Sequence, residues 1–159
     1  MRIFVVRHAE AGSRHDWTGC DRDRPLSSKG WDRANALATV LGDRGIGRLL
    51  SSPYLRCTQT FGPLASTLGL TIEDRDALAE GAPLASGIDL IEQLVADGVP
   101  AAVCSHGDVI PELLGGLARR GTLVDSSGRC PKGSVWVLTA VDGEVTQAIY
   151  TGKSERPAD

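Results

Sequence analysis

Short apolar runs alternate with longer segments of helical periodicity along this chain, and that alternation limits the folds open to it. The apolar runs are rich in β-branched residues, are bounded by Gly, Pro, Ser or charged residues, and lie at residues 3–6, 49–50, 101–104 and 135–138. Helical i, i+3, i+4, i+7 spacing is followed by Ala34, Leu37, Ala38 and Leu41 and by a second set between Cys57 and Leu68. Continuously apolar strands separated by helices indicate a mostly parallel sheet covered on both faces. We therefore predict an α/β fold, a three-layer sandwich with a mostly parallel central sheet.

Local signals predict where some helices begin and where one is interrupted. Ser52 and Pro53 have the residue types of a helix N-cap and a first helical residue. Gly62 and Pro63 are expected to kink or divide the helix that follows.

Two further signals lie in the C-terminal half. Asp108 is expected to cap a helix over residues 110–120. Asp142 and Gly143 are expected to turn a late strand back into residues 145–150, which predicts an antiparallel hairpin at the edge of the sheet.

The length and charge of the chain bound its organisation and its partners. With 159 residues, it has the size of one domain that can bury its own core, and we expect a single domain over residues 1–151 with a polar tail over 152–159. The net charge of −3 and an aromatic content of 4% argue against a nucleic acid partner. No apolar run reaches the roughly 18–20 residues of a membrane span, and the first is too short for a signal peptide. We expect a cytoplasmic protein without a membrane partner.

The residue types that commonly bind metals lack the spacing of a metal site. The four cysteines have no C-x-x-C pairing, and neither H-x-H nor H-E-x-x-H occurs. No glycine-rich nucleotide loop is present either. We expect the cysteines to be reduced and without chemistry, and we expect no metal and no cofactor.

Polar residues follow three of the predicted strands at their carboxyl ends. Arg7 and His8 follow the first strand, Arg56 lies shortly after the second, and His106 follows the third. Because ligands of open α/β sheets bind outside the carboxyl ends of the strands, we expect these segments to meet in one place. Two neighbouring arginines favour a bound anion. A guanidinium group can donate two parallel hydrogen bonds to the oxygens of a phosphate.

A histidine in such a pocket can attack phosphorus, which divides hydrolysis into phosphoryl transfer to the enzyme and then to water. Its second ring nitrogen must then be held by an acceptor. The leaving oxygen also needs a proton, and Glu80, in the loop of residues 79–83, is a candidate general acid if its surroundings keep it protonated. The alternative is that Glu80 is an ordinary solvated loop residue. Glu10 and Asp108 are reserve candidates for the acid.

Three spaced motifs resemble the signature segments of the histidine phosphatase superfamily, also called phosphoglycerate mutase-like. They are Arg7-His8 after the first strand, the stretch from Ser52 through Arg56 to Thr60, and the segment 105–108, which reads Ser-His-Gly-Asp. Residues 18–30 resemble the connection into the first helix of that family. The matches span residues 2–108 in the order of the family, and they imply a phosphoglycerate mutase-like fold.

The resemblance also implies a role for each site residue. His8 would be the phosphorylated nucleophile, and Glu80 would be the proton donor. The rest of the phosphate pocket would be formed by Arg7, Arg56 and His106. No metal takes part in the mechanism of the family.

Two departures from the family pattern indicate which type of family member the chain resembles. Ala9 stands where mutase-type members have glycine, and the loop 10–17 lacks the asparagine expected in mutases. This Arg-His-Ala type is most similar to small single-domain bacterial phosphohistidine phosphatases and to the histidine-phosphatase domain of Nudix fusion proteins. The resemblance therefore implies a metal-independent phosphatase acting on a phosphorylated small molecule, such as a nucleotide, or on a phosphoprotein.

Several alternatives stay open. The same pocket could belong to a binding module that holds a phosphorylated ligand without turnover, or to a mutase acting on a small phosphorylated acid. Arg14 and Arg22 lie in or near an alternating charge run that is typical of a solvated face, and the alternative is contact with a second phosphate. The sequence does not indicate an oligomeric state.

Overall fold

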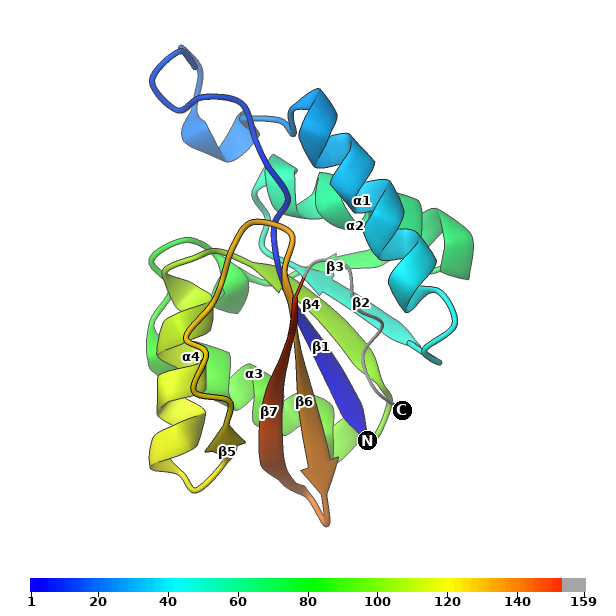
Figure 1. Cartoon of the computed structure of the whole chain (residues 1–159), viewed down its shortest axis with the longest axis vertical. Coiled ribbons are helices and arrows are strands. Elements are labelled where there is room, and N and C mark those ends of the chain that lie inside the picture. The colour runs from blue at the N-terminus through cyan, green and yellow to red at the C-terminus, as the bar shows by residue number, and fades with distance from the viewer. Residues whose placement is uncertain (153–159) are drawn as a thin grey trace.

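The computed structural model describes residues 1–152 and contains one mixed β-sheet with helices on both faces (Figure 1). Within those residues the strands are β1 (Arg2–Arg7), β2 (Arg48–Ser51), β3 (Ile72–Asp74), β4 (Ala101–Ser105), β5 (Leu123–Val124), β6 (Val135–Val141) and β7 (Glu144–Gly152). The α-helices are α1 (Ser28–Leu41), α2 (Leu55–Leu68), α3 (Leu84–Asp97) and α4 (Val109–Arg119). Apart from residue 152, the predicted polar tail lies outside the described residues.

The sheet has the strand order β3-β2-β4-β1-β6-β7-β5. Strands β3, β2, β4 and β1 run parallel to one another, β6 is antiparallel to β1 and β7, and β5 is parallel to β7. The prediction of an α/β fold with a mostly parallel central sheet is confirmed. Because β1, β2 and β4 are parallel, their carboxyl ends share one edge of the sheet.

Side chains alternate along β1 between two hydrophobic layers. Ile3 and Val5 pack with α3 and α4 on one face, whereas Phe4 and Val6 pack with α1 and α2 on the other. All four side chains are buried. The continuous apolar run is therefore explained by a strand that is covered on both faces, and Figure 1 shows the two helix pairs on opposite sides of the sheet.

Strands β6 and β7 form the predicted hairpin. The two residues between them, Asp142 and Gly143, have φ angles of 51° and 84°. Both angles lie in the left-handed region, as a two-residue type I′ turn requires. The hairpin does not itself form the edge of the sheet, because the short strand β5 pairs with the outer side of β7.

The start of α2 differs from the prediction. The helix begins at Leu55 with Tyr54 in the N-cap position, and neither Ser52 nor Pro53 caps or begins it. Ser52 instead continues the extended chain beyond β2, since its main-chain N–H donates to the carbonyl of Cys104 at 2.9 Å. The expected cap is therefore wrong, and the Ser52 hydroxyl is left available for another partner.

The middle of α2 also corrects the prediction, because the helix is continuous through Pro63. Phe61 and Leu64, on either side of that proline, are fully buried in the same hydrophobic layer. Burial of both halves against the sheet keeps the segment in one helix, so the expected division does not occur.

Asp108 occupies the N-cap position of α4, but its side chain makes no capping hydrogen bond. Its Oδ2 instead accepts a hydrogen bond of 2.9 Å from the main-chain N–H of Gly81. Asp108 therefore has the expected position but not the expected capping hydrogen bond. Its carboxylate instead fixes the loop that carries Glu80.

None of the helices within residues 1–152 has the combination of length and apolar character that a bilayer span needs.

Candidate active site

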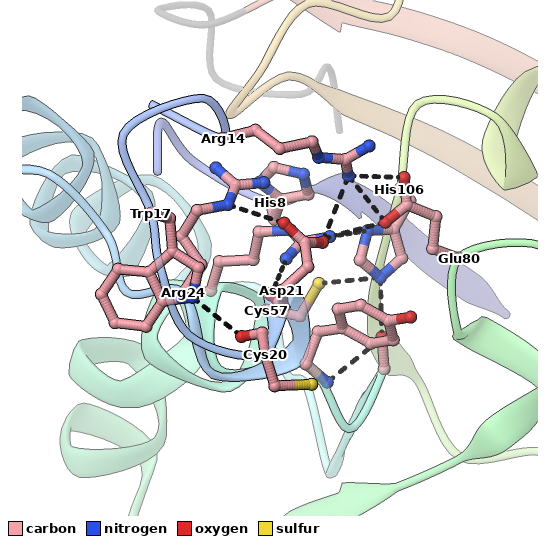
Figure 2. Close-up of polar contacts among 12 residues, drawn as sticks. His8, Arg14, Trp17, Cys20, Asp21, Arg24, Cys57, Glu80 and His106 are labelled. Atoms are coloured by element: carbon pink, nitrogen blue, oxygen red, sulfur yellow. Dashed lines mark hydrogen bonds and ion pairs between the residues drawn. The ribbon is translucent and has the colours of Figure 1, made fainter. Parts of the chain in front are cut away.

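The carboxyl ends of β1 and β4 and the start of α2 surround a cavity of about 380 Å³. Arg7 and His8 follow β1, Arg56 lies in the first turn of α2, and His106 follows β4. All four side chains line the cavity, together with Glu80 from the loop before α3. The structure thus brings together the five residues singled out in the sequence, and Figure 2 shows His8, His106 and Glu80 in close proximity.

His8 is held in a single orientation by main-chain groups. The main-chain N–H of His8 donates to the carbonyl of Ser105 at 3.0 Å. On the ring, Nδ1 lies 2.7 Å from the carbonyl oxygen of Ala9. A carbonyl can only accept, so Nδ1 carries the proton of the neutral ring and Nε2 carries the lone pair. The ring therefore has the tautomer that a nucleophile acting through Nε2 needs.

The environment of His8 keeps the imidazole neutral. Burial lowers the pKa of His8 from its ordinary value of 6.5 to about 3. The hydrogen bond to Ala9 opposes this decrease, and the charges of His106, Arg56 and Arg7 add to it. A neutral imidazole with an available lone pair is therefore present throughout the physiological pH range.

His106 is held by α2 and by the end of β2. Its Nε2 lies 2.8 Å from the hydroxyl of Ser52 and 3.5 Å from the thiol of Cys57. Its Nδ1 lies 3.5 Å from Nη2 of Arg56, and its ring meets that of His8 edge to face with centroids 5.3 Å apart. Ser52, expected to cap a helix, is thus a positioning residue for this histidine.

Cys57 was expected to have no chemistry, and its contact with His106 is a hydrogen bond of 3.5 Å inside the protein. The thiol is fully buried. Burial raises the pKa of Cys57, but hydrogen bonds with Cys104 and His106 outweigh that effect and lower it below its usual range.

Arg56 is almost fully buried, with 1% of its surface exposed. Its Nη1 donates to the main-chain carbonyl of Asp21 at 2.8 Å, and its Nη2 lies 2.8 Å from Oε2 of Glu80 and 3.1 Å from Oδ2 of Asp21. Tyr54 stacks beneath the guanidinium at 4.6 Å. The buried guanidinium group of Arg56 is therefore oriented by the carboxylates of Asp21 and Glu80, which come from two separate loops.

Two guanidinium N–H groups at the cavity remain unsatisfied. The Nε atoms of Arg7 and Arg56 are buried and have no hydrogen-bond acceptor within the part of the chain that the structure describes. Arg7 uses its Nη1 to donate to the carbonyl of Cys130 at 2.5 Å. Both side chains also line the cavity, and two guanidinium groups in one cavity favour an anionic ligand.

Glu80 lies between two arginines. Its carboxylate accepts hydrogen bonds from Nη2 of Arg56 at 2.8 Å and from Nη2 of Arg14 at 2.9 and 3.0 Å. Figure 2 shows the side chains of Arg14 and Glu80 facing each other. About a third of the Glu80 side chain, 33%, is exposed, so this residue is neither a solvated loop side chain nor a deeply buried one. The reserve acid Glu10 does not line the cavity and lies near Lys29 and Ser27 instead.

The loop between β1 and α1 contributes groups that sequence reasoning did not assign to the site. Arg24 lines the cavity and donates to Asp21 at 2.8 Å and to the carbonyl of Gly12 at 2.5 Å. Partial burial raises the pKa of Asp21, but the hydrogen bond from Arg24 and the charges of Arg56 and Arg14 hold it below its usual range. This carboxylate therefore stays ionised and fixes the loop to Arg56.

Lys132 lines the same cavity and was also missed. It lies in the loop that returns to the sheet before β6, and no local motif marks it. Only the pairing of β6 with β1, which a local sequence pattern does not reveal, brings it there.

Within residues 1–152, no group of three or more His, Cys, Asp or Glu side chains is arranged to hold a metal ion.

Comparison with known proteins gives one family. Residues 3–83 match the sequence profile of the histidine phosphatase superfamily (branch 1). A protein of Mycolicibacterium smegmatis named 8-oxo-(d)GTP phosphatase is 36% identical over 152 residues, which is 93% of this chain and 47% of that protein. A Haemophilus influenzae protein named phosphohistidine phosphatase SixA homolog is 29% identical over 133 residues, which is 72% of this chain and 78% of that protein. The chain thus spans about half the length of the first relative.

A solved structure shows the same fold. The structure of the protein histidine phosphatase SixA complexed with tungstate superposes with a TM-score of 0.75 at 23% sequence identity, covering 94% of each chain.

Proposed function

Because the chain belongs to branch 1 of the histidine phosphatase superfamily, we propose that it hydrolyses a phosphorylated substrate through a covalent phosphohistidine on His8. The observation that carries the proposal is that a neutral histidine, protonated on Nδ1, lines the same cavity as the guanidinium groups of Arg7 and Arg56. A phosphoryl group in that cavity would pair with the guanidinium groups and present phosphorus to the lone pair of Nε2.

In the first step, Nε2 of His8 forms a bond to phosphorus as the bond to the leaving oxygen breaks. Nδ1 keeps its proton, and its hydrogen bond to the Ala9 carbonyl stabilises the positive charge that develops on the ring. Arg7 and Arg56 bind the equatorial oxygens, where negative charge is spread in the transition state. His106, held by Ser52, completes the pocket.

Glu80 supplies the proton that the leaving oxygen needs. In the ligand-free site its carboxyl oxygens pair with the guanidinium groups of Arg14 and Arg56. An arriving phosphoryl group competes for Arg56, and Glu80 released from that pairing can take up a proton and deliver it to the leaving oxygen. In the second step the Glu80 carboxylate accepts a proton from water as the water oxygen attacks phosphorus, which releases inorganic phosphate and restores neutral His8.

The two relatives support two substrate classes. One is named for a nucleotide and the other for phosphohistidine, and the phosphoryl chemistry above is common to both. The proposed partner of this chain is accordingly a phosphorylated small molecule or a phosphoprotein.

The test is hydrolysis of an aryl phosphate in the presence of EDTA by the wild-type protein, His8→Ala and His15→Ala. His15 is a matched control because its side chain is 96% exposed and, among residues 1–152, pairs with Asp16 alone. We expect His8→Ala to lose at least about a thousandfold in kcat, with His15→Ala unchanged. A rapidly quenched reaction should also trap an acid-labile, alkali-stable phosphoenzyme. Equal turnover by His8→Ala and wild type would overturn the proposal, and tight phosphate binding without turnover would favour the binding module.

A further inference from the structure

The cavity is larger and more cationic than a single phosphoryl group requires. Its volume of about 380 Å³ lies within the range of roughly 300–1,000 Å³ that is usual for small-molecule sites. Five cationic side chains line it against two carboxylates, although the whole chain carries a net charge of −3. The cations are Arg7, Arg14, Arg24, Arg56 and Lys132. Arg24 is buried and donates to Asp21 and Gly12, whereas Arg14 and Lys132 are exposed. The proposed chemistry at His8 assigns neither of these two exposed cations a contact with the scissile phosphoryl group.

Arg14 lies immediately beside the arginine that binds the scissile phosphoryl group. Nη2 of Arg14 and Nη2 of Arg56 both contact the same oxygen, Oε2 of Glu80, at 3.0 and 2.8 Å. A group bonded to the scissile phosphoryl group and pointing out of the cavity therefore passes within reach of Arg14. The Arg14 side chain is 62% exposed, so it covers no core, and its ion pairs are with Glu80 and Asp21 at this site.

Lys132 approaches the site from another loop. The N–H of the next residue, Gly133, donates to the carbonyls of Arg7 and His8 at 3.0 and 3.1 Å, so the main chain at Lys132 lies beside the nucleophile. No side chain among residues 1–152 forms an ion pair or hydrogen bond with the Lys132 ammonium group. Figure 1 shows this loop and the loop after β1 at the same end of the sheet. An exposed, unpartnered cation that lines the cavity is available for substrate.

We propose that Arg14 and Lys132 form a second anion subsite, which binds the phosphate adjacent to the scissile one, so that the substrate is a small molecule carrying a chain of at least two phosphates. This inference rests on the proposed function, because it takes His8 as the site of the scissile phosphoryl group. The bond broken is then a phosphoanhydride, and the leaving group is itself a phosphate. A phosphorylated side chain of a folded protein has only one such group and leaves the subsite without a ligand.

The test compares two non-reacting probes, inorganic phosphate and methylenediphosphonate, by calorimetric titration in EDTA. We expect the wild-type protein to bind the diphosphonate at least about tenfold more tightly than phosphate, since the second phosphonate group adds charge-assisted contacts with Arg14 and Lys132. Lys132→Ala and Arg14→Ala should each remove most of this preference, and Lys132→Arg should retain it. The ratio of the two dissociation constants in one variant is the readout, so a change in phosphate binding caused by freeing Glu80 cancels.

Two matched controls lie outside the cavity. Lys29→Ala and Arg120→Ala each remove an exposed cation that pairs with a carboxylate, Glu10 and Glu92 respectively, and both should keep the wild-type ratio. Equal affinity for the two probes in the wild type, or an unchanged ratio in both Lys132→Ala and Arg14→Ala, overturns the subsite. Hydrolysis that depends on His8 without a diphosphonate preference would keep the proposed function and reject the subsite. A preference for the diphosphonate without His8-dependent hydrolysis would keep the subsite and reject the proposed function.

Discussion

The guanidinium group of Arg7 lies directly against the α-carbon of Gly107. A β-carbon placed on Gly107 would lie 2.5 Å from the central guanidinium carbon and 2.8 Å from Nε of Arg7, distances at which one of the two groups must move. Gly107 follows His106 in the segment after β4, so this segment both supplies a histidine and leaves room for an arginine. The absence of a side chain at residue 107 therefore sets the position of the Arg7 guanidinium group in the cavity.

Gly107→Ala is expected to displace Arg7 and to lower kcat/KM for an aryl phosphate by about a hundredfold, the loss that a misplacement of about 1 Å can cause. Steady-state kinetics and thermal unfolding measure the effect on activity and on fold. Gly62→Ala is the control, because a β-carbon at residue 62 meets no atom within 4 Å, and it should keep wild-type activity. A fully active Gly107→Ala would show that Arg7 is not required in its present position.

Thr60 connects the loop after His8 to α2, and its loss should affect both stability and rate. Its buried hydroxyl accepts from the N–H of Ala9 at 2.9 Å and donates to the carbonyl of Arg56 at 2.6 Å. Thr60→Val leaves the Ala9 N–H unpaired, and we expect the free energy of unfolding to fall by about 1–3 kcal/mol, together with kcat. Thr60→Ser keeps the hydroxyl and should recover most of the rate. Urea unfolding and kinetics on both variants distinguish a positioning hydroxyl from simple packing, which would leave Thr60→Val the more active of the two.

Glu80→Gln should show a loss that depends on the leaving group. An alkoxide needs a proton more than a phenolate or a phosphate does, so we expect the largest decrease in kcat, about 10²- to 10⁴-fold, with alkyl phosphates. The decrease should be smaller with 4-nitrophenyl phosphate. Rates of a series of esters measured with both proteins would give a steeper dependence on leaving-group pKa for the variant. Parallel dependences would exclude Glu80 as the proton donor.

The burial of His8 predicts a pH dependence of stability. Because burial lowers the pKa of His8 from 6.5 to about 3 in the folded protein, the unfolded chain binds a proton between these values that the folded chain does not. The contribution to stability is complete above about pH 6.5 and is lost as the pH falls towards 3, by up to about 1.4 kcal/mol per pH unit. Urea unfolding between pH 4 and 7 should therefore give a shallower pH dependence for His8→Asn than for the wild type. His15→Asn, altered at an exposed position, should follow the wild type, and equal slopes in all three proteins would contradict the prediction.

The parts of the fold that were predictable are those in which local patterns and long-range packing agree. The strands at residues 3–6 and 101–104 are apolar throughout because they are buried on both faces, and the sequence shows this directly. β3 and β5 carry no such pattern. β5 consists of Leu123 and Val124 alone, and Leu123 is 73% exposed, so its pairing with β7 is decided by the position of the hairpin rather than by its own residues.

One general rule and three sequence motifs predicted that the central residues of the site would lie together. They did not predict the residues at its outer part. Residues at the carboxyl ends of parallel strands must meet, which places Arg7, His8 and His106 together. Asp21 and Lys132 come from loops whose paths depend on tertiary contacts, and no spacing in the sequence marks them. The roles of the five site residues remain predictions that the variants above test.

The pairing of β1 also has a consequence for biosynthesis. The strand that ends beside His8 is translated well before both of its hydrogen-bonded neighbours, β4 and β6. A nascent chain therefore leaves the ribosome with an apolar strand that has two unpaired edges, the kind of segment that aggregates or recruits chaperones. Fragments that end before β6 lack a neighbour of β1 as well as Lys132, so a chain released early should be a substrate for quality control rather than a partly active enzyme.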